Sequence, residues 1–159
     1  MTKVALVTGG SRGIGAAISK ALQAAGFQVA ANYAGNDDAA RAFTEETGIK
    51  TYKWSVADYD ACAAGCRQVE EELGPIAVLV NNAAHQATFE SIEDISAEEW
   101  DVTFRTNIYS QFYLCKAAIP TMKPGSAIVN TTSINAKNPK PTLLAYATTK
   151  GAIANFTAG

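Results

Sequence analysis

Tyr146 and Lys150 are the residues whose types and spacing point most directly to chemistry. A free phenol has a pKa of about 10, too high for easy proton exchange at neutral pH, and a neighbouring cation lowers such a pKa by stabilising the phenolate. Lys150 follows Tyr146 by four residues, so on a helix the two side chains share a face. A lysine in this position could therefore help a tyrosine to exchange a proton. Taken alone, the pair would be interpreted as an ordinary half-exposed helical pair.

A glycine-rich segment, Thr8-Gly9-Gly10-Ser11-Arg12-Gly13-Ile14-Gly15, suggests phosphate binding. Glycines allow a tight turn and a close backbone approach to a pyrophosphate, and a following helix offers free N–H groups and a positive dipole end. The spacing is neither the common G-x-G-x-x-G fingerprint nor a Walker loop, since no Lys-Ser/Thr pair follows. The alternative is a tight strand–helix turn that binds nothing.

The elements that must position these residues alternate between strand and helix. Hydrophobic patterns predict strands over 4–8, 27–33, 49–56, 76–80 and 127–131, and helices over 14–25, 38–46, 58–73 and 144–158. A further long helix after Ser96 carries Trp100, Phe104, Ile108 and Phe112 on one stripe. This alternation predicts an α/β fold, a parallel sheet with right-handed crossovers in a single domain over 1–159.

Composition narrows the function classes. The chain has 159 residues, 48% of them apolar, and a net charge of -2, which argues against a nucleic-acid partner. No apolar run approaches the ~20 residues that a membrane span needs, so we expect a soluble cytoplasmic protein without a membrane partner. Cys62, Cys66 and Cys115 are expected to be small buried hydrophobes. His85 is the only histidine, and no metal site is predicted.

Three further features complete a recognisable order. Asn81-Asn82-Ala83-Ala84 follows the fourth predicted strand, Asn107 lies on the long helix, and Ser133 follows the fifth strand. With the glycine loop and Tyr146-x-x-x-Lys150, they resemble the T-G-x-x-x-G-x-G, N-N-A-G, Asn, Ser, Y-x-x-x-K pattern of classical short-chain dehydrogenases/reductases. The resemblance covers residues 1–159.

The two halves resemble different branches of that family. Residues through about Asn82 are similar to acetoacetyl-CoA reductases and β-ketoacyl-carrier-protein reductases. Residues from Ala84 onward are similar to stress-type or glucose-dehydrogenase-like members. The chain is therefore interpreted as a chimera or as a member between branches.

The resemblance implies a Rossmann-like, doubly wound parallel sheet with strand order 3-2-1-4-5. Family members continue with a sixth and a seventh strand, so the chain looks C-terminally incomplete and the fifth strand would be an edge. Ala84 replaces the usual glycine, a mild change in a loop beside the cofactor.

The same resemblance implies hydride transfer between a nicotinamide and a carbonyl carbon. Tyr146 would exchange the proton, and Lys150 would assist it and hold the nicotinamide ribose. Ser133 would orient the substrate oxygen, and Asn107 would fix a water linking Lys150 to solvent. Without the resemblance, Asn107 would be an ordinary helix-surface amide.

NADP(H) is the expected cofactor. No carboxylate precedes Asp37 after the second predicted strand, and Arg12 is placed to meet a 2′-phosphate. NAD(H) remains the alternative, because Asp37 or Asp38 could reach inward. The expected cofactor-binding residues are Gly9, Ser11, Arg12, Gly13, Ile14, Gly15, Asn32, Tyr33, Ser55, Val56, Asn82, Ala83, Ala84, Tyr146 and Lys150.

The favoured hypothesis is an NAD(P)H-dependent oxidoreductase acting on a small-molecule ketone or secondary alcohol, including 3-oxoacyl thioesters such as acetoacetyl-CoA. By resemblance it would form a homo-oligomer, a dimer or tetramer, through the long helix and the Tyr146 helix. The second hypothesis is a truncated or chimeric fragment that binds cofactor without turnover. A Rossmann-like methyltransferase is a distant third, since it would not need Y-x-x-x-K.

Overall fold

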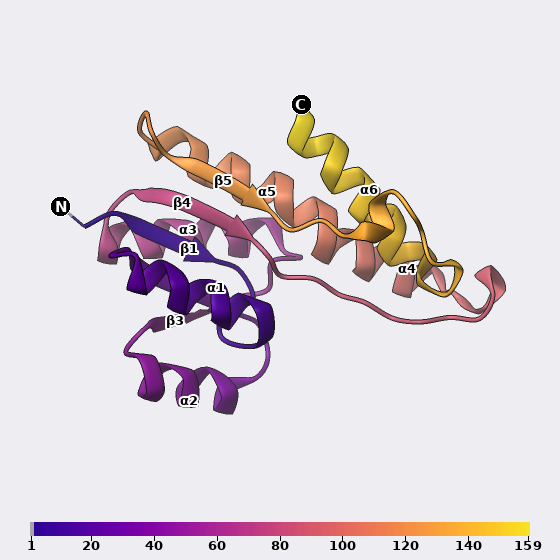
Figure 1. Ribbon diagram of the computed structural model, residues 1–159, viewed down its shortest axis with the longest axis horizontal. Helices are drawn as coiled ribbons and strands as arrows, with labels where there is room; N and C mark the ends of the chain where they lie inside the picture. Colours follow the sequence, from indigo (N-terminus) through magenta and orange to yellow (C-terminus); the bar gives the residue numbers. More distant parts are fainter. Residues whose placement is uncertain (1) are drawn as a thin grey trace.

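The computed structural model describes residues 2–159 and contains a five-stranded parallel sheet (Figure 1). The strands are β1 Val4–Val7, β2 Gln28–Tyr33, β3 Lys50–Lys53, β4 Ile76–Asn81 and β5 Ala127–Asn130. Their order across the sheet is β3-β2-β1-β4-β5, which confirms the predicted order. In this register Val7 pairs with Ala31 on one side and with Val80 on the other.

The helices are α1 Gly13–Ala24, α2 Asp37–Thr47, α3 Tyr59–Leu73, α4 Ala97–Phe104, α5 Ser110–Ala118 and α6 Leu144–Ala158. Two of them begin at side-chain caps: the Asp58 side chain accepts from the Ala61 amide at 2.7 Å, and Ser96 Oγ accepts from the Glu99 amide at 3.0 Å. Over residues 2–159, no helix has both the length and the apolar character of a membrane span.

Both faces of the sheet are covered at its centre, which explains why β1 is apolar throughout. On β1, Val4 and Leu6 point to a core that they share with α3 and α5, while Ala5 and Val7 point to a core that they share with α1 and α2. Helix α6 packs against α4 and the segment after α4, beyond the β5 side of the sheet (Figure 1).

Two elements differ from the sequence-based expectation. Strand β3 ends at Lys53, opposite the last residue of β2, so Trp54 to Val56 form a loop at the carboxyl edge rather than more strand. The expected long helix contains a π-helical turn, Arg105–Tyr109, between α4 and α5. An i→i+5 turn adds a residue and rotates the helix after it, so the predicted stripe breaks: Phe104 stacks on Trp100, whereas Phe112 is 50% exposed.

The chain winds from β1 towards β3 in one direction and from β4 towards β5 in the other. The carboxyl ends of β1 and β4 therefore flank the point where the strand order reverses, the usual position of a ligand crevice in open α/β sheets. The glycine loop follows β1 and the segment from Asn82 follows β4, so both lie at this point.

Candidate active site

The glycine loop folds back tightly on the start of α1. Gly9 and Gly13 have φ values of +60° and +52°, a region that favours glycine. A Cβ on Gly15 would lie 1.9 Å from the Gly9 carbonyl oxygen, so a larger residue there would force the loop apart. The N-terminus of α1 has no side-chain cap, so the first N–H groups of this helix are free to bind an anion.

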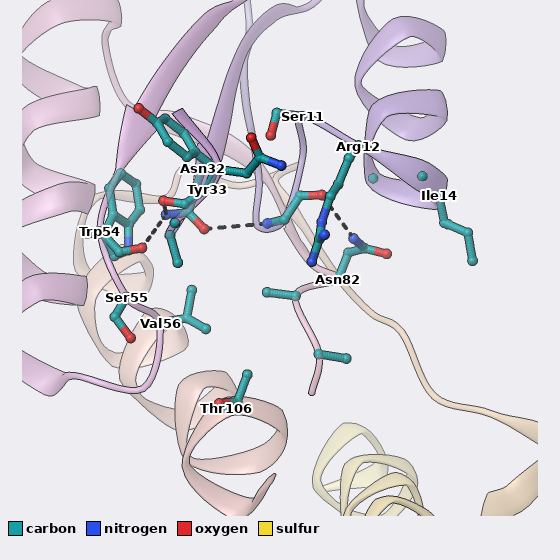
Figure 2. Close-up of a pocket in the computed structure, with 18 residues that line it drawn as sticks. Ser11, Arg12, Ile14, Asn32, Tyr33, Trp54, Ser55, Val56, Asn82 and Thr106 are labelled. Atoms are coloured by element: carbon teal, nitrogen blue, oxygen red, sulfur yellow. Dashed lines mark hydrogen bonds between the residues drawn. The ribbon is translucent and has the colours of Figure 1, made fainter. Parts of the chain in front are cut away.

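A cleft of about 690 Å³ opens beside this loop, and Figure 2 shows the residues that line it. Thirteen of the predicted cofactor-binding residues line it: Gly9, Ser11, Arg12, Gly13, Ile14, Gly15, Asn32, Tyr33, Ser55, Val56, Asn82, Ala83 and Ala84. Five lining residues were not predicted: Ala34, Gly35, Asn36, Trp54 and Thr106. The first four adjoin predicted residues in the sequence, whereas Thr106 comes from the π turn, which no sequence pattern indicated.

Two buried polar side chains fix the walls of the cleft. Asn32 Nδ2 donates to the Trp54 carbonyl at 3.0 Å, and Asn32 Oδ1 accepts from the Gly9 amide at 3.4 Å, joining the ends of β2 and β3 to the glycine loop. Thr8 Oγ1 accepts from the amides of Asn82 and Ala83 at 3.0 and 3.1 Å. The glycine loop is therefore attached on one side to β2 and on the other to the segment after β4.

The charged residues nearest the end of β2, Asp37 and Lys53, bond to each other and do not line the cleft. The Asp37 carboxylate accepts from Lys53 Nζ at 2.8 Å and from the Tyr33 hydroxyl at 3.0 Å. The Lys53 hydrogen bond, followed by that of Tyr33, lowers the pKa of the Asp37 carboxyl. Neither Asp37 nor any other carboxylate is among the described residues that line the cleft, while the exposed Arg12 guanidinium is. In this structure two hydrogen bonds hold the Asp37 carboxylate outside the cleft, away from the inward position that the NAD(H) alternative requires.

Lys150 is almost completely buried, with 2% of its surface exposed. Its Nζ donates to the Thr131 carbonyl at 2.8 Å and lies 5.3 Å from the centre of the Tyr146 ring, which is half-buried on the same helix. Burial lowers the pKa of the Lys150 ammonium to about 8. Lys150 is therefore buried against the Tyr146 ring, whereas the alternative interpretation would leave the pair half-exposed on the helix surface.

Ser133 lies at the start of a 3₁₀ turn, Ile134–Ala136, just beyond β5. Its Oγ accepts from the backbone amide of Asn135 at 3.2 Å and from the Asn135 side-chain amide at 3.3 Å. A hydroxyl that accepts in this way keeps its own proton to donate, as the predicted contact with a substrate oxygen requires.

Asn107 is fully buried in the π turn, so its interpretation as a helix-surface amide is wrong. Its Oδ1 accepts from the His85 amide at 2.7 Å, and its Nδ2 donates to the His85 carbonyl at 2.9 Å and to Thr149 Oγ1 at 3.0 Å. Both amide hydrogens are used, so the predicted water contact would rest on the second lone pair of Oδ1.

The cysteines and the possible metal-binding side chains of the described residues form no further reactive cluster. Cys62, Cys66 and Cys115 are free and buried, as expected, and burial raises the pKa of the Cys62 and Cys66 thiols to about 12. Within residues 2–159 no three His, Cys, Asp or Glu residues are placed to hold a metal ion.

Comparison with known proteins extends this description. The family model described as short chain dehydrogenase matches residues 3–159. An acetoacetyl-CoA reductase of Paracoccus denitrificans is 58% identical over 99% of this chain and 65% of its own length, so one relative aligns with both halves. General stress protein 39 of Bacillus subtilis (strain 168) is 46% identical over 98% of this chain and 56% of its own.

Solved structures agree with the sequence comparison. A blue fluorescent protein from a metagenomic library, solved in complex with NADPH, superposes with a TM-score of 0.91 and 31% identity over 97% of this chain and 65% of its own. The present chain thus spans about two thirds or less of the length of the relatives it matches. On its family match, its relatives and its fold, the chain belongs to the short-chain dehydrogenase family.

Proposed function

We propose that this chain forms the NADP(H)-binding and proton-transfer part of an oxidoreductase that interconverts a ketone and a secondary alcohol. The observation that carries the proposal is the combination of a cleft beside the glycine loop, with no carboxylate among its described lining residues, and a buried lysine beside Tyr146. Lys150 bonds to the Thr131 carbonyl directly after β5, and the cleft residues follow β1, β2 and β4, so both features lie at the carboxyl edge of the sheet.

The residues of the cleft fit a dinucleotide. A Cβ added to Gly13 would meet open space, and the uncapped start of α1 adjoins that space, so a pyrophosphate has both room and N–H donors. Arg12 lines the same cleft, where its guanidinium suits a 2′-phosphate. The absence of a carboxylate among the described lining residues favours NADP(H) over NAD(H), because the ribose diol of NAD(H) calls for an acidic partner.

The nicotinamide, when bound, supplies or accepts a hydride at the carbonyl carbon. The chain's own residues handle the proton and the geometry. Ser133 donates to the substrate oxygen, and Tyr146 gives its hydroxyl proton to that oxygen as negative charge develops on it. Lys150, a cation at pH 7 that is held by the Thr131 carbonyl, provides positive charge beside the phenol. Tyr146 recovers its proton from solvent after the product leaves.

The proposed substrate class is a 3-oxoacyl thioester such as acetoacetyl-CoA. Support comes from the acetoacetyl-CoA reductase of Paracoccus denitrificans, which matches 99% of the chain at 58% identity. We also propose a homo-oligomer, because Val102, Tyr109 and Phe112 are 45%, 44% and 50% exposed along α4 to α5. Light scattering tests this part: a monodisperse monomer at high concentration would refute it.

The main test is a titration of the purified chain with NADPH and NADH, followed by nicotinamide fluorescence. We expect tighter binding of NADPH, and we expect Arg12→Ala to remove most of that preference while leaving NADH binding nearly unchanged. Tighter NADH binding that is insensitive to Arg12→Ala would refute the cofactor assignment. Oxidation of NADPH on adding acetoacetyl-CoA then separates the two functional hypotheses, since binding without oxidation would identify a cofactor-binding fragment.

A further inference from the structure

The segment Asn82–Ser91 crosses the site without regular secondary structure. At its start, Asn82, Ala83 and Ala84 line the cofactor cleft. Near its end, the Phe89 amide donates to the Thr142 carbonyl at 3.0 Å. Because no regular secondary structure fixes the segment, the positions of the cleft-lining residues at its start depend on side-chain contacts made near its middle.

His85 makes that attachment with both its backbone and its ring. Its amide and carbonyl both bond to the side chain of Asn107, at 2.7 and 2.9 Å. Its ring Nε2 lies 2.7 Å from Glu99 Oε1, and because a carboxylate only accepts, the ring nitrogen donates. Glu99 Oε1 also accepts from Thr103 Oγ1 at 3.2 Å, which fixes the carboxylate on α4.

We propose that the His85–Glu99 pair is a brace that positions the catalytic helix α6 through Asn107, and this inference rests on the proposed function of Tyr146 and Lys150. Asn107 Nδ2 also donates to Thr149 Oγ1, and Thr149 Oγ1 in turn donates to the Tyr146 carbonyl at 2.7 Å. One connected set of bonds therefore runs from α4 through the segment after β4 to the turn of α6 that carries Tyr146.

The ring of His85 adds something that the backbone bonds cannot. Two bonds to a single carboxamide allow the segment to pivot about Asn107, whereas a third bond to Glu99, at a separate point earlier on the same long helix, removes that freedom. The pair is partly shielded, with 35% of the His85 side chain and 24% of the Glu99 side chain exposed. His85 and Glu99 are positioning residues, since they act on the site through Asn107.

Amide hydrogen exchange at His85 tests the brace in the cofactor-free chain. Its amide donates to Asn107, so exchange reports how often that attachment opens. We expect Glu99→Ala to speed exchange roughly fivefold, the size expected for one lost hydrogen bond. Glu99→Gln keeps an acceptor oxygen and should stay near the parent rate. Glu98→Ala removes the same charge from the same exposed turn of α4 and serves as the matched control.

Kinetics supply the second readout. Glu99→Ala and His85→Phe should each lower kcat several-fold with little change in the Kd for NADPH, and the double variant should be no slower than either single variant. Unchanged His85 exchange in Glu99→Ala, or additive losses in the double variant, would overturn the brace. If the parent fails to bind NADPH, the proposed function fails, while the exchange comparison still decides whether the brace exists.

Discussion

Replacing Lys150 with methionine should make the fold more stable at neutral pH while it weakens the site. Burial lowers the pKa of Lys150 from 10.5 to about 8. At about 1.4 kcal/mol per pKa unit, the buried cation costs about 3 kcal/mol at pH 7. Methionine removes that cost but loses the bond to the Thr131 carbonyl, worth about 1 kcal/mol, which leaves a net gain of about 2 kcal/mol in the free energy of unfolding.

The pH dependence gives this prediction its signature. Between about pH 8 and 10.5 the unfolded chain still binds the Lys150 proton and the folded chain does not, so the stability of the parent rises with pH across this window. The methionine variant lacks this contribution. Its advantage over the parent should therefore be full below about pH 8 and should reverse to a deficit of about 1 kcal/mol near pH 10.5, where the neutral Lys150 no longer costs folding energy but keeps its bond to Thr131.

Urea denaturation of the parent and the variant at pH 7, 9 and 10.5 measures the difference directly, because all other titrating groups are common to both chains. Lys137→Met makes the same substitution at an exposed lysine and is the control. A pH-independent difference for Lys150→Met would refute the account of a buried cation. The more stable variant should also bind NADPH more weakly, since Lys150 is proposed to contact the ribose.

Three further changes test other parts of the site. Tyr146→Phe should slow ketone reduction about 10²–10⁴-fold with NADPH affinity nearly unchanged, and turnover above about a tenth of the parent rate would exclude Tyr146 as the acid. Gly65→Ala places a Cβ 2.5 Å from the Trp54 ring, and thermal denaturation should show a loss of about 1–3 kcal/mol. Gly15→Ala, blocked by the Gly9 carbonyl, should abolish NADPH binding in fluorescence titrations, and retained binding would contradict the observed loop.

The sheet and most of the cleft could be predicted because their signals are local. Ile76 to Val80 is entirely apolar because the strand is buried between helix layers, and the glycines of the loop after β1 are required by its left-handed turns. The thirteen predicted cofactor residues that line the cleft follow the carboxyl ends of the strands, where parallel topology brings them together, whereas Tyr146 and Lys150 lie on α6 and do not line it.

The remaining features depend on contacts between distant residues. No sequence pattern predicts the π turn that buries Asn107. Because Thr106 belongs to the same turn, its position in the cleft was not predicted either. The sequence predicts no role for His85, because its partner Glu99 is fourteen residues away and lies beyond an irregular segment. The bond from Lys53 to Asp37 joins the edge strand β3 to the start of α2. Sequence spacing alone does not predict this contact.

The order of the cleft residues along the chain has a consequence for synthesis. All the residues that line the cleft lie between Gly9 and Thr106, whereas Ser133, Tyr146 and Lys150 come later. At translation rates of about 5–20 residues per second, Thr106 is synthesised before the helix that carries Tyr146 and Lys150 by an interval on the order of seconds. A nascent chain thus contains all the described residues that line the cleft before it contains Tyr146 and Lys150, and a dinucleotide bound to the cleft in that interval would stabilise β1 to β4 while β5 and α6 are still being made.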